Sequence, residues 1–86
     1  MIMNMLYEKS INNGIQKVYK FENGFGASVV QHDYSYGSSE GKWELAVLEF
    51  EGDDWVLTYD TPITSDVLGY LDEEEIELIL KEIQAL

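Results

Sequence analysis

Two Asn-Gly dipeptides, Asn13-Gly14 and Asn23-Gly24, constrain the fold of this chain more than any other local feature. Asparagine and glycine both tolerate positive φ, which a type I′ β-hairpin turn requires at its two central positions. The dipeptides bracket residues 15–22 (IQKVYKFE), and the flanking segments 5–12 and 25–32 are suited to pair with it on either side. The sequence therefore predicts two consecutive hairpins and an antiparallel sheet.

The most strand-like segment of the chain covers residues 42–50 (KWELAVLEF), after a polar loop at residues 33–41. A turn at residues 51–53 and a returning strand at residues 54–60 complete a predicted antiparallel meander of four to five strands. Segment 42–50 is apolar on both faces, so both faces need cover. That cover could come from the N-terminal segment, from closure of the sheet into a partial barrel, or from a second subunit.

The chain changes character at Pro62, because the sequence after this proline has helical periodicity. We predict a short helical turn at residues 66–70 and a longer helix that begins after Asp72. Asp72 and Glu75 have the spacing of a capping box, and Leu71 is placed to form a hydrophobic staple. The apolar residues of this helix share one arc of about 120° that should pack on the sheet; they are Ile76, Ile79, Leu80, Ile83 and Leu86.

The predicted fold class is α+β, with a single domain over residues 1–86 whose C-terminal helix packs on one face of the meander. The chain contains no cysteine, which excludes a disulfide scaffold and a thiolate metal site. Residues 1–7 lack the basic start and long apolar run of a signal peptide, and no stretch approaches the ~18 apolar residues that cross a membrane. We therefore expect a cytoplasmic protein without a membrane partner.

Charge is distributed unevenly along the 86 residues, which carry 17 acidic residues against five lysines for a net charge of −12. Residues 1–39 hold three acids and three lysines, whereas residues 40–86 hold 14 acids and two lysines and so account for the whole −12. A field of this sign repels nucleic acid and attracts basic surfaces. We expect no direct contact with nucleic acid, since no basic patch is present to neutralise phosphates.

Two features of the sequence are candidates for binding a partner. The loop after His32 carries tyrosines on a backbone rich in glycine and serine, as recognition loops do, although an ordinary connection has the same composition. The acidic residues of the second half fit either a docking face for a basic protein or a solvated face with helix capping. The expected partner-binding residues are Tyr34, Tyr36, Glu44, Glu49, Glu51, Asp53 and Asp54.

No motif predicts catalysis or metal binding. His32 is the only histidine, and its neighbour Asp33 would point to the opposite face of a strand. The carboxylates of residues 51–54 lack the spacing of an EF-hand loop, and a turn explains them. Gly26 does not belong to a phosphate-binding loop and indicates local crowding or a bulge. We expect neither an enzyme nor a bound metal or cofactor.

Three segments, residues 19–32 (YKFENGFGASVVQH), 43–50 (WELAVLEF) and 59–80 (YDTPITSDVLGYLDEEEIELIL), are similar to small uncharacterised proteins encoded by bacteriophages and prophages. The resemblance carries no catalytic or ligand motif. It implies a setting, the cytoplasm of a bacterial host, in which small acidic phage proteins act by binding host proteins.

Together these observations predict a non-enzymatic, acidic interaction protein. Its partner would be a basic host protein. Binding would inhibit that protein if the acidic surface mimics a nucleic acid and occupies its binding site. The alternative is a self-associating structural or assembly module, such as a homodimer, that uses an apolar sheet face left uncovered.

Overall fold

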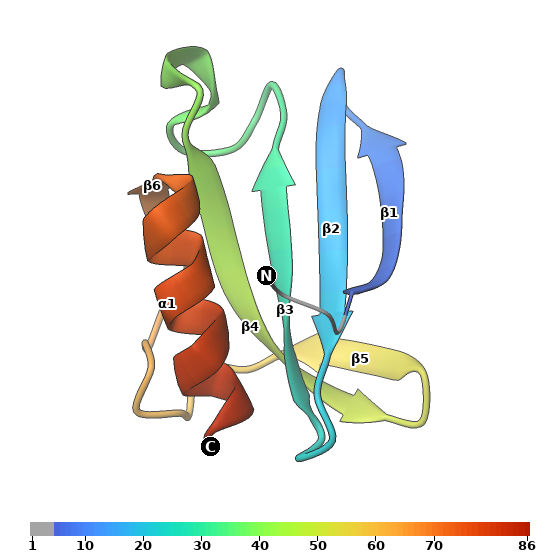
Figure 1. Cartoon of the computed structure of the whole chain (residues 1–86). Coiled ribbons are helices and arrows are strands. Elements are labelled where there is room, and N and C mark those ends of the chain that lie inside the picture. The colour runs from blue at the N-terminus through green and yellow to red at the C-terminus, as the bar shows by residue number, and fades with distance from the viewer. Residues whose placement is uncertain (1–4) are drawn as a thin grey trace.

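The computed structural model describes residues 5–86 and contains one antiparallel sheet and one long helix. Figure 1 shows the helix lying against one face of the sheet. Part of the segment compared above with a signal peptide, residues 1–7, lies outside the described residues. The elements are β1 (Met5–Ile11), β2 (Gly14–Lys20), β3 (Phe25–Gln31), the 3-10 turn η1 (Ser38–Glu40), β4 (Trp43–Glu51), β5 (Asp54–Leu57), β6 (Leu68–Leu71) and α1 (Glu73–Gln84).

The strand order confirms the predicted α+β meander. The sheet runs β1-β2-β3-β4-β5, and β6 pairs with β4 outside this path. Every pairing is antiparallel. One edge of β4 pairs with β3, while the other is shared, with β6 at residues 43–45 and β5 at residues 48–51.

The first hairpin turn lies one residue earlier than the sequence predicted. Its central residues are Asn12 and Asn13, with φ of 46° and 62°, and Gly14 is the first residue of β2. Two asparagines supply the positive φ that a type I′ turn needs. Gly14 serves a different purpose, since a Cβ there would lie 1.9 Å from the carbonyl oxygen of Gln31.

The second hairpin turn has positive φ only at Gly24, where φ is 87°, so the predicted type I′ turn is wrong. The Gly24 N–H donates to the Phe21 carbonyl at 3.1 Å, as in a three-residue loop that closes with a bulge. Asn23 Oδ1 accepts the Phe25 N–H at 3.0 Å within this turn, and the same side chain also has a tertiary role. Its amide nitrogen donates to the carbonyls of Ile83 at 2.9 Å and Leu86 at 3.1 Å, and so satisfies carbonyls at the C-terminal end of α1.

The predicted helical turn at residues 66–70 is wrong, because residues 68–71 form β6. This strand pairs Leu71 with Trp43 and Leu68 with Leu45 on β4. Gly69 has weak helix propensity, and β5 leaves this part of the β4 edge free for pairing. The predicted strand at residues 54–60 is also shorter, since β5 ends at Leu57.

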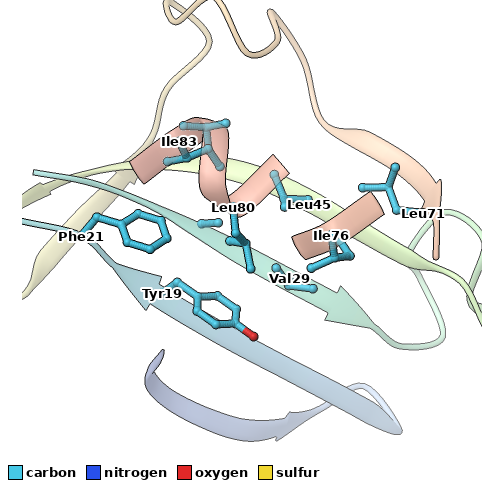
Figure 2. Close-up of a cluster of buried hydrophobic side chains, with 10 residues drawn as sticks. Tyr19, Phe21, Val29, Leu45, Leu71, Ile76, Leu80 and Ile83 are labelled. Carbon is cyan, nitrogen blue, oxygen red and sulfur yellow. The ribbon is translucent and has the colours of Figure 1, made fainter. Parts of the chain in front are cut away.

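The C-terminal helix forms as predicted. Asp72 Oδ1 accepts the Glu75 N–H at 2.8 Å, and Glu75 Oε1 accepts the Asp72 N–H at 3.0 Å, which completes the capping box. Ile76, Leu80 and Ile83 are buried on its inner face. In Figure 2 these side chains point from α1 toward the sheet, where they meet the main core cluster of Tyr19, Phe21, Ala27, Val29, Leu45, Val47 and Leu71.

The opposite face of the sheet is also covered, because the sheet curls into a half-barrel. Val18 and Leu48 on this face are fully buried. In Figure 1 the β4–β5 hairpin swings across below β2, on the side where β1 lies. Trp55 Nε1 on β5 donates to Tyr7 Oη on β1 at 3.3 Å. Partial closure of the sheet, one of the alternatives that the sequence left open, is therefore observed, and β1 of the N-terminal segment takes part in it.

Candidate functional site

The predicted partner-binding residues separate into two groups at opposite ends of β4 (Figure 1). The tyrosines lie in the connection from β3, close to Glu44 near the start of β4. A strand rises ~3.3 Å per residue, so β4 spans roughly 25 Å. The second group lies at its far end, in the β4–β5 hairpin, and consists of Glu49, Glu51, Asp53 and Asp54. The structure therefore does not bring tyrosines and hairpin carboxylates into one site.

The tyrosines of the β3–β4 connection are strongly exposed, Tyr34 by 80% and Tyr36 by 60%. The Tyr36 carbonyl accepts the backbone N–H of Tyr70 on β6 at 3.3 Å. Tyr70 is itself 57% exposed and adds a third aromatic ring to this end of the molecule. Sequence reasoning missed it because it predicted a helical turn in place of β6.

Two polar side chains hold this connection in shape. Glu44 Oε1 accepts the backbone N–H of Tyr36 at 2.9 Å, and His32 Nδ1 accepts the backbone N–H of Tyr34 at 3.1 Å. Both side chains thus replace missing backbone partners within the loop. Glu44 accordingly has a structural role here that no feature of the sequence predicted.

Three carboxylates and one valine share one side of the β4–β5 hairpin, because side chains two apart on a strand point the same way and paired residues share a face. The register pairs Glu51 with Asp54 and Glu49 with Val56. All four are exposed, and they line a hollow of about 450 Å³ together with two aromatic residues. We call the set Glu49, Glu51, Asp54 and Val56 the acidic hairpin face.

The acidic hairpin face holds its negative charges close together. Glu51 lies directly opposite Asp54, and like charges in such cross-strand pairs destabilise a sheet. Within residues 5–86 no lysine forms an ion pair with any of the three carboxylates. A basic group brought to this face would therefore relieve a repulsion that the hairpin otherwise carries.

Asp53, the remaining predicted hairpin residue, lies in the turn and, unlike Glu49, Glu51 and Asp54, forms an ion pair. Lys20 Nζ lies 3.0 Å from its Oδ1 and 5.5 Å from the centre of the Phe50 ring. The Asp53 side chain is 82% exposed, so the pair contributes little to stability. Lys20 nevertheless compensates Asp53 and leaves the acidic hairpin face as the uncompensated part of the predicted group.

A second hollow, of about 350 Å³, lies between the start of α1 and the sheet. Lys17 Nζ sits 4.9 Å from the centre of the Trp43 ring, which makes a cation–π contact inside this hollow. Its floor consists of core side chains such as Val29 and Leu80. The cationic and aromatic groups here already contact each other, so this hollow is a weaker candidate than the hairpin.

Tyr19 lies in this second hollow and gives the fold a pH dependence. Burial raises the pKa of its phenol above the usual 10.0, and the nearby charge of Glu8 adds to the shift. Above pH 10.0 the unfolded chain loses a proton that the folded chain retains, so the stability from the neutral phenol is lost as pH rises through the folded pKa. We expect the urea midpoint to fall less steeply above about pH 10 in Tyr19→Phe than in wild type. Tyr34→Phe, which removes an exposed hydroxyl, is the control, and an unchanged slope in Tyr19→Phe would contradict the prediction.

Within residues 5–86, no group of three or more histidine or carboxylate side chains is arranged to hold a metal ion. In the same part of the chain, no helix is both long and apolar enough to cross a membrane.

Comparison of the chain with protein-family models, curated proteins and solved structures finds no match. The functional inference therefore depends on the charges, contacts and exposed edges of the chain itself.

Proposed function

We propose that this chain is a non-enzymatic binding protein that docks its acidic hairpin face onto a basic surface of another protein. The observation that carries this proposal is the clustering of Glu49, Glu51 and Asp54 on one exposed side of one hairpin, without a compensating lysine within residues 5–86. Side chains that serve only to solvate a surface have no need to lie opposite a like charge.

The charge of the whole chain supports the same function. A net charge of −12 attracts a basic partner over long distances and accelerates its association. Under the resemblance to phage-encoded proteins, the partner would be a host protein in the bacterial cytoplasm. Binding would inhibit that protein wherever its basic surface is a nucleic-acid site, since the carboxylates would occupy the place of phosphates.

Affinity capture from a bacterial lysate tests the proposal, with the wild-type chain as bait. We expect a basic protein to be retained at low salt and released as the Debye length falls to ~8 Å. The triple variant Glu49→Lys/Glu51→Lys/Asp54→Lys should bind the captured protein on the order of 100-fold more weakly, because three attractions become repulsions.

The matched control is Glu40→Lys/Asp60→Lys/Glu82→Lys, which changes net charge by the same amount at exposed positions outside strands β4 and β5. It should retain most of the wild-type affinity. Equal weakening by the two variants would show that only net charge matters, and binding that is insensitive to salt would overturn the proposal.

A further inference from the structure

We infer that the partner contributes an extended, basic segment that adds to the sheet as a new strand along the outer edge of β5. This inference rests on the proposed function, because it specifies the form of the partner that the acidic hairpin face attracts. Its test can fail while the proposed function holds, because a folded basic surface could dock on the same carboxylates without pairing with β5.

The backbone of β5 is available for pairing along its outer edge. The Thr58 N–H donates to the Val47 carbonyl at 2.9 Å, and the directions of backbone groups alternate along an antiparallel strand. Val56 therefore directs its N–H and C=O toward β4, whereas Trp55 and Leu57 direct theirs away from the sheet. Within residues 5–86 no strand other than β4 pairs with β5.

The side chains beside this edge are exposed and differ between the two faces of the strand. Val56, on the acidic hairpin face, is 63% exposed, and Leu57, on the other face, is 46% exposed. Side chains of an added strand would alternate between these faces. One row would lie directly beside Asp54 and Val56, on the same face as Glu49 and Glu51 one strand further in, and the other beside Leu57. The fitting segment therefore alternates long basic side chains, which reach across this face, with apolar residues.

Charge favours a basic segment over a second copy of this chain as the occupant. Natural edge strands are often protected from pairing by lysines, but the only charged residue in β5 is Asp54. Two copies, each with a net charge of −12, repel each other, and pairing through β5 would bring their hairpin carboxylates together. The other outer strand, β1, carries both Glu8 and Lys9 and lacks this selectivity.

The probe for this inference is a short synthetic peptide of alternating lysine and valine, titrated into the full chain. Strand addition should slow hydrogen exchange at the amides of Trp55 and Leu57, because the added strand accepts hydrogen bonds from them. The same peptide with backbone N-methyl groups on alternate residues keeps its charge but loses donors on one edge. It should bind about tenfold more weakly, as expected for the loss of two or more hydrogen bonds.

Leu57→Pro removes one outward N–H and leaves the hydrogen bonds to β4 in place. Edge strands tolerate proline at positions whose N–H faces away from the sheet. Leu57→Ala is its control, because it shortens the same side chain and retains the N–H. We expect Leu57→Pro to lower the affinity for the lysine–valine peptide about tenfold relative to Leu57→Ala. Should Leu57→Pro disturb the hairpin, the exchange rates measured on the wild-type chain still decide the question.

Three outcomes would overturn the inference. The peptide could bind without slowing exchange at Trp55 and Leu57, in which case the carboxylates act alone and the proposed function stands. The peptide could fail to bind although the protein captured from the lysate binds the chain. The strand-addition inference would then be wrong, while the proposed function would stand. Finally, sedimentation without peptide could reveal a dimer that protects these same amides, which would identify a second copy as the occupant.

Discussion

Replacing Gly26 with alanine is expected to lower the free energy of unfolding by about 3 kcal/mol, at the upper end of the usual cost of overpacking. A Cβ at this position would lie 1.9 Å from the Tyr19 carbonyl oxygen and 2.7 Å from Cε2 of Phe50. The backbone oxygen belongs to the adjacent strand β2 and cannot move without disturbing the ladder. Since domains of this size are marginally stable, such a loss removes much of the total.

Urea denaturation of Gly26→Ala beside wild type measures this loss, and the melting temperature should fall by roughly 4–8 °C for each kcal/mol. Gly52→Ala is the matched control. Gly52 has a φ of 64°, and a methyl group added there would have no atom within 4 Å, so alanine meets only backbone strain of about 1 kcal/mol. Equal destabilisation by the two substitutions would show that close approach of β2 and β3 is not what Gly26 permits.

Some features that depend on a few neighbouring residues were predictable from the sequence, although the geometry of the two Asn-Gly turns was not. The capping box of Asp72 and Glu75 and the apolar arc of α1 follow from spacing within one or two helical turns. Gly26 was expected to relieve crowding or to mark a bulge, and the close approach of the Tyr19 carbonyl oxygen in an unshifted register supports crowding. The need to cover both faces of β4 was also evident from alternation alone, although the sequence did not distinguish among the possible covers.

Features that depend on distant segments were not predictable in the same way. β6 forms because β5 leaves part of the β4 edge unpaired, which no property of residues 66–71 reveals. Asn23 lies in a turn, as predicted, but its amide nitrogen also donates to carbonyls at the end of α1, some sixty positions away in the sequence. In β6 a tertiary contact overrides local propensity, whereas at Asn23 it is added to the local role.

The candidate site was predicted in its composition but not in its geometry. Carboxylates were identified by type, and nothing in the sequence separates Glu44, which holds the Tyr36 backbone, from Glu49, which faces solvent. The separation of the tyrosines from the hairpin follows from the length of β4 and was implicit in the predicted strand. The open edge of β5 could have been anticipated, because the last strand of a meander has only one neighbour.

This division of roles makes the hairpin suitable for functional tests. Within residues 5–86, the side chains of Glu49, Glu51 and Asp54 form no hydrogen bond or ion pair, so their replacement removes charge and little else. Removing like-charge repulsion between Glu51 and Asp54 should even favour the hairpin slightly. Loss of binding in such variants therefore reports on the partner contact. Loss of binding in Glu44 variants would also reflect the lost hydrogen bond to the Tyr36 backbone.

Leu48→Ala is expected to destabilise the fold by about 2–5 kcal/mol, the same range as Leu80→Ala. Leu80 lies in α1 over the main core, whereas Leu48 lies on the opposite face of β4, and both are fully or almost fully buried. Curling of the sheet packs Leu48 into a second core, so removal of either leucine side chain leaves a cavity that the surroundings fill only in part. Denaturant midpoints of the two variants compare the two faces directly.

Leu78→Ala provides the control, because Leu78 is 62% exposed on α1 and alanine is a good helix former. Its stability should differ from that of wild type by no more than about 0.5 kcal/mol. A Leu48→Ala variant that resembled Leu78→Ala would mean that the face of the sheet away from α1 is not packed in solution. The same result would restore this face as a surface for self-association, since its apolar residues would then need another cover.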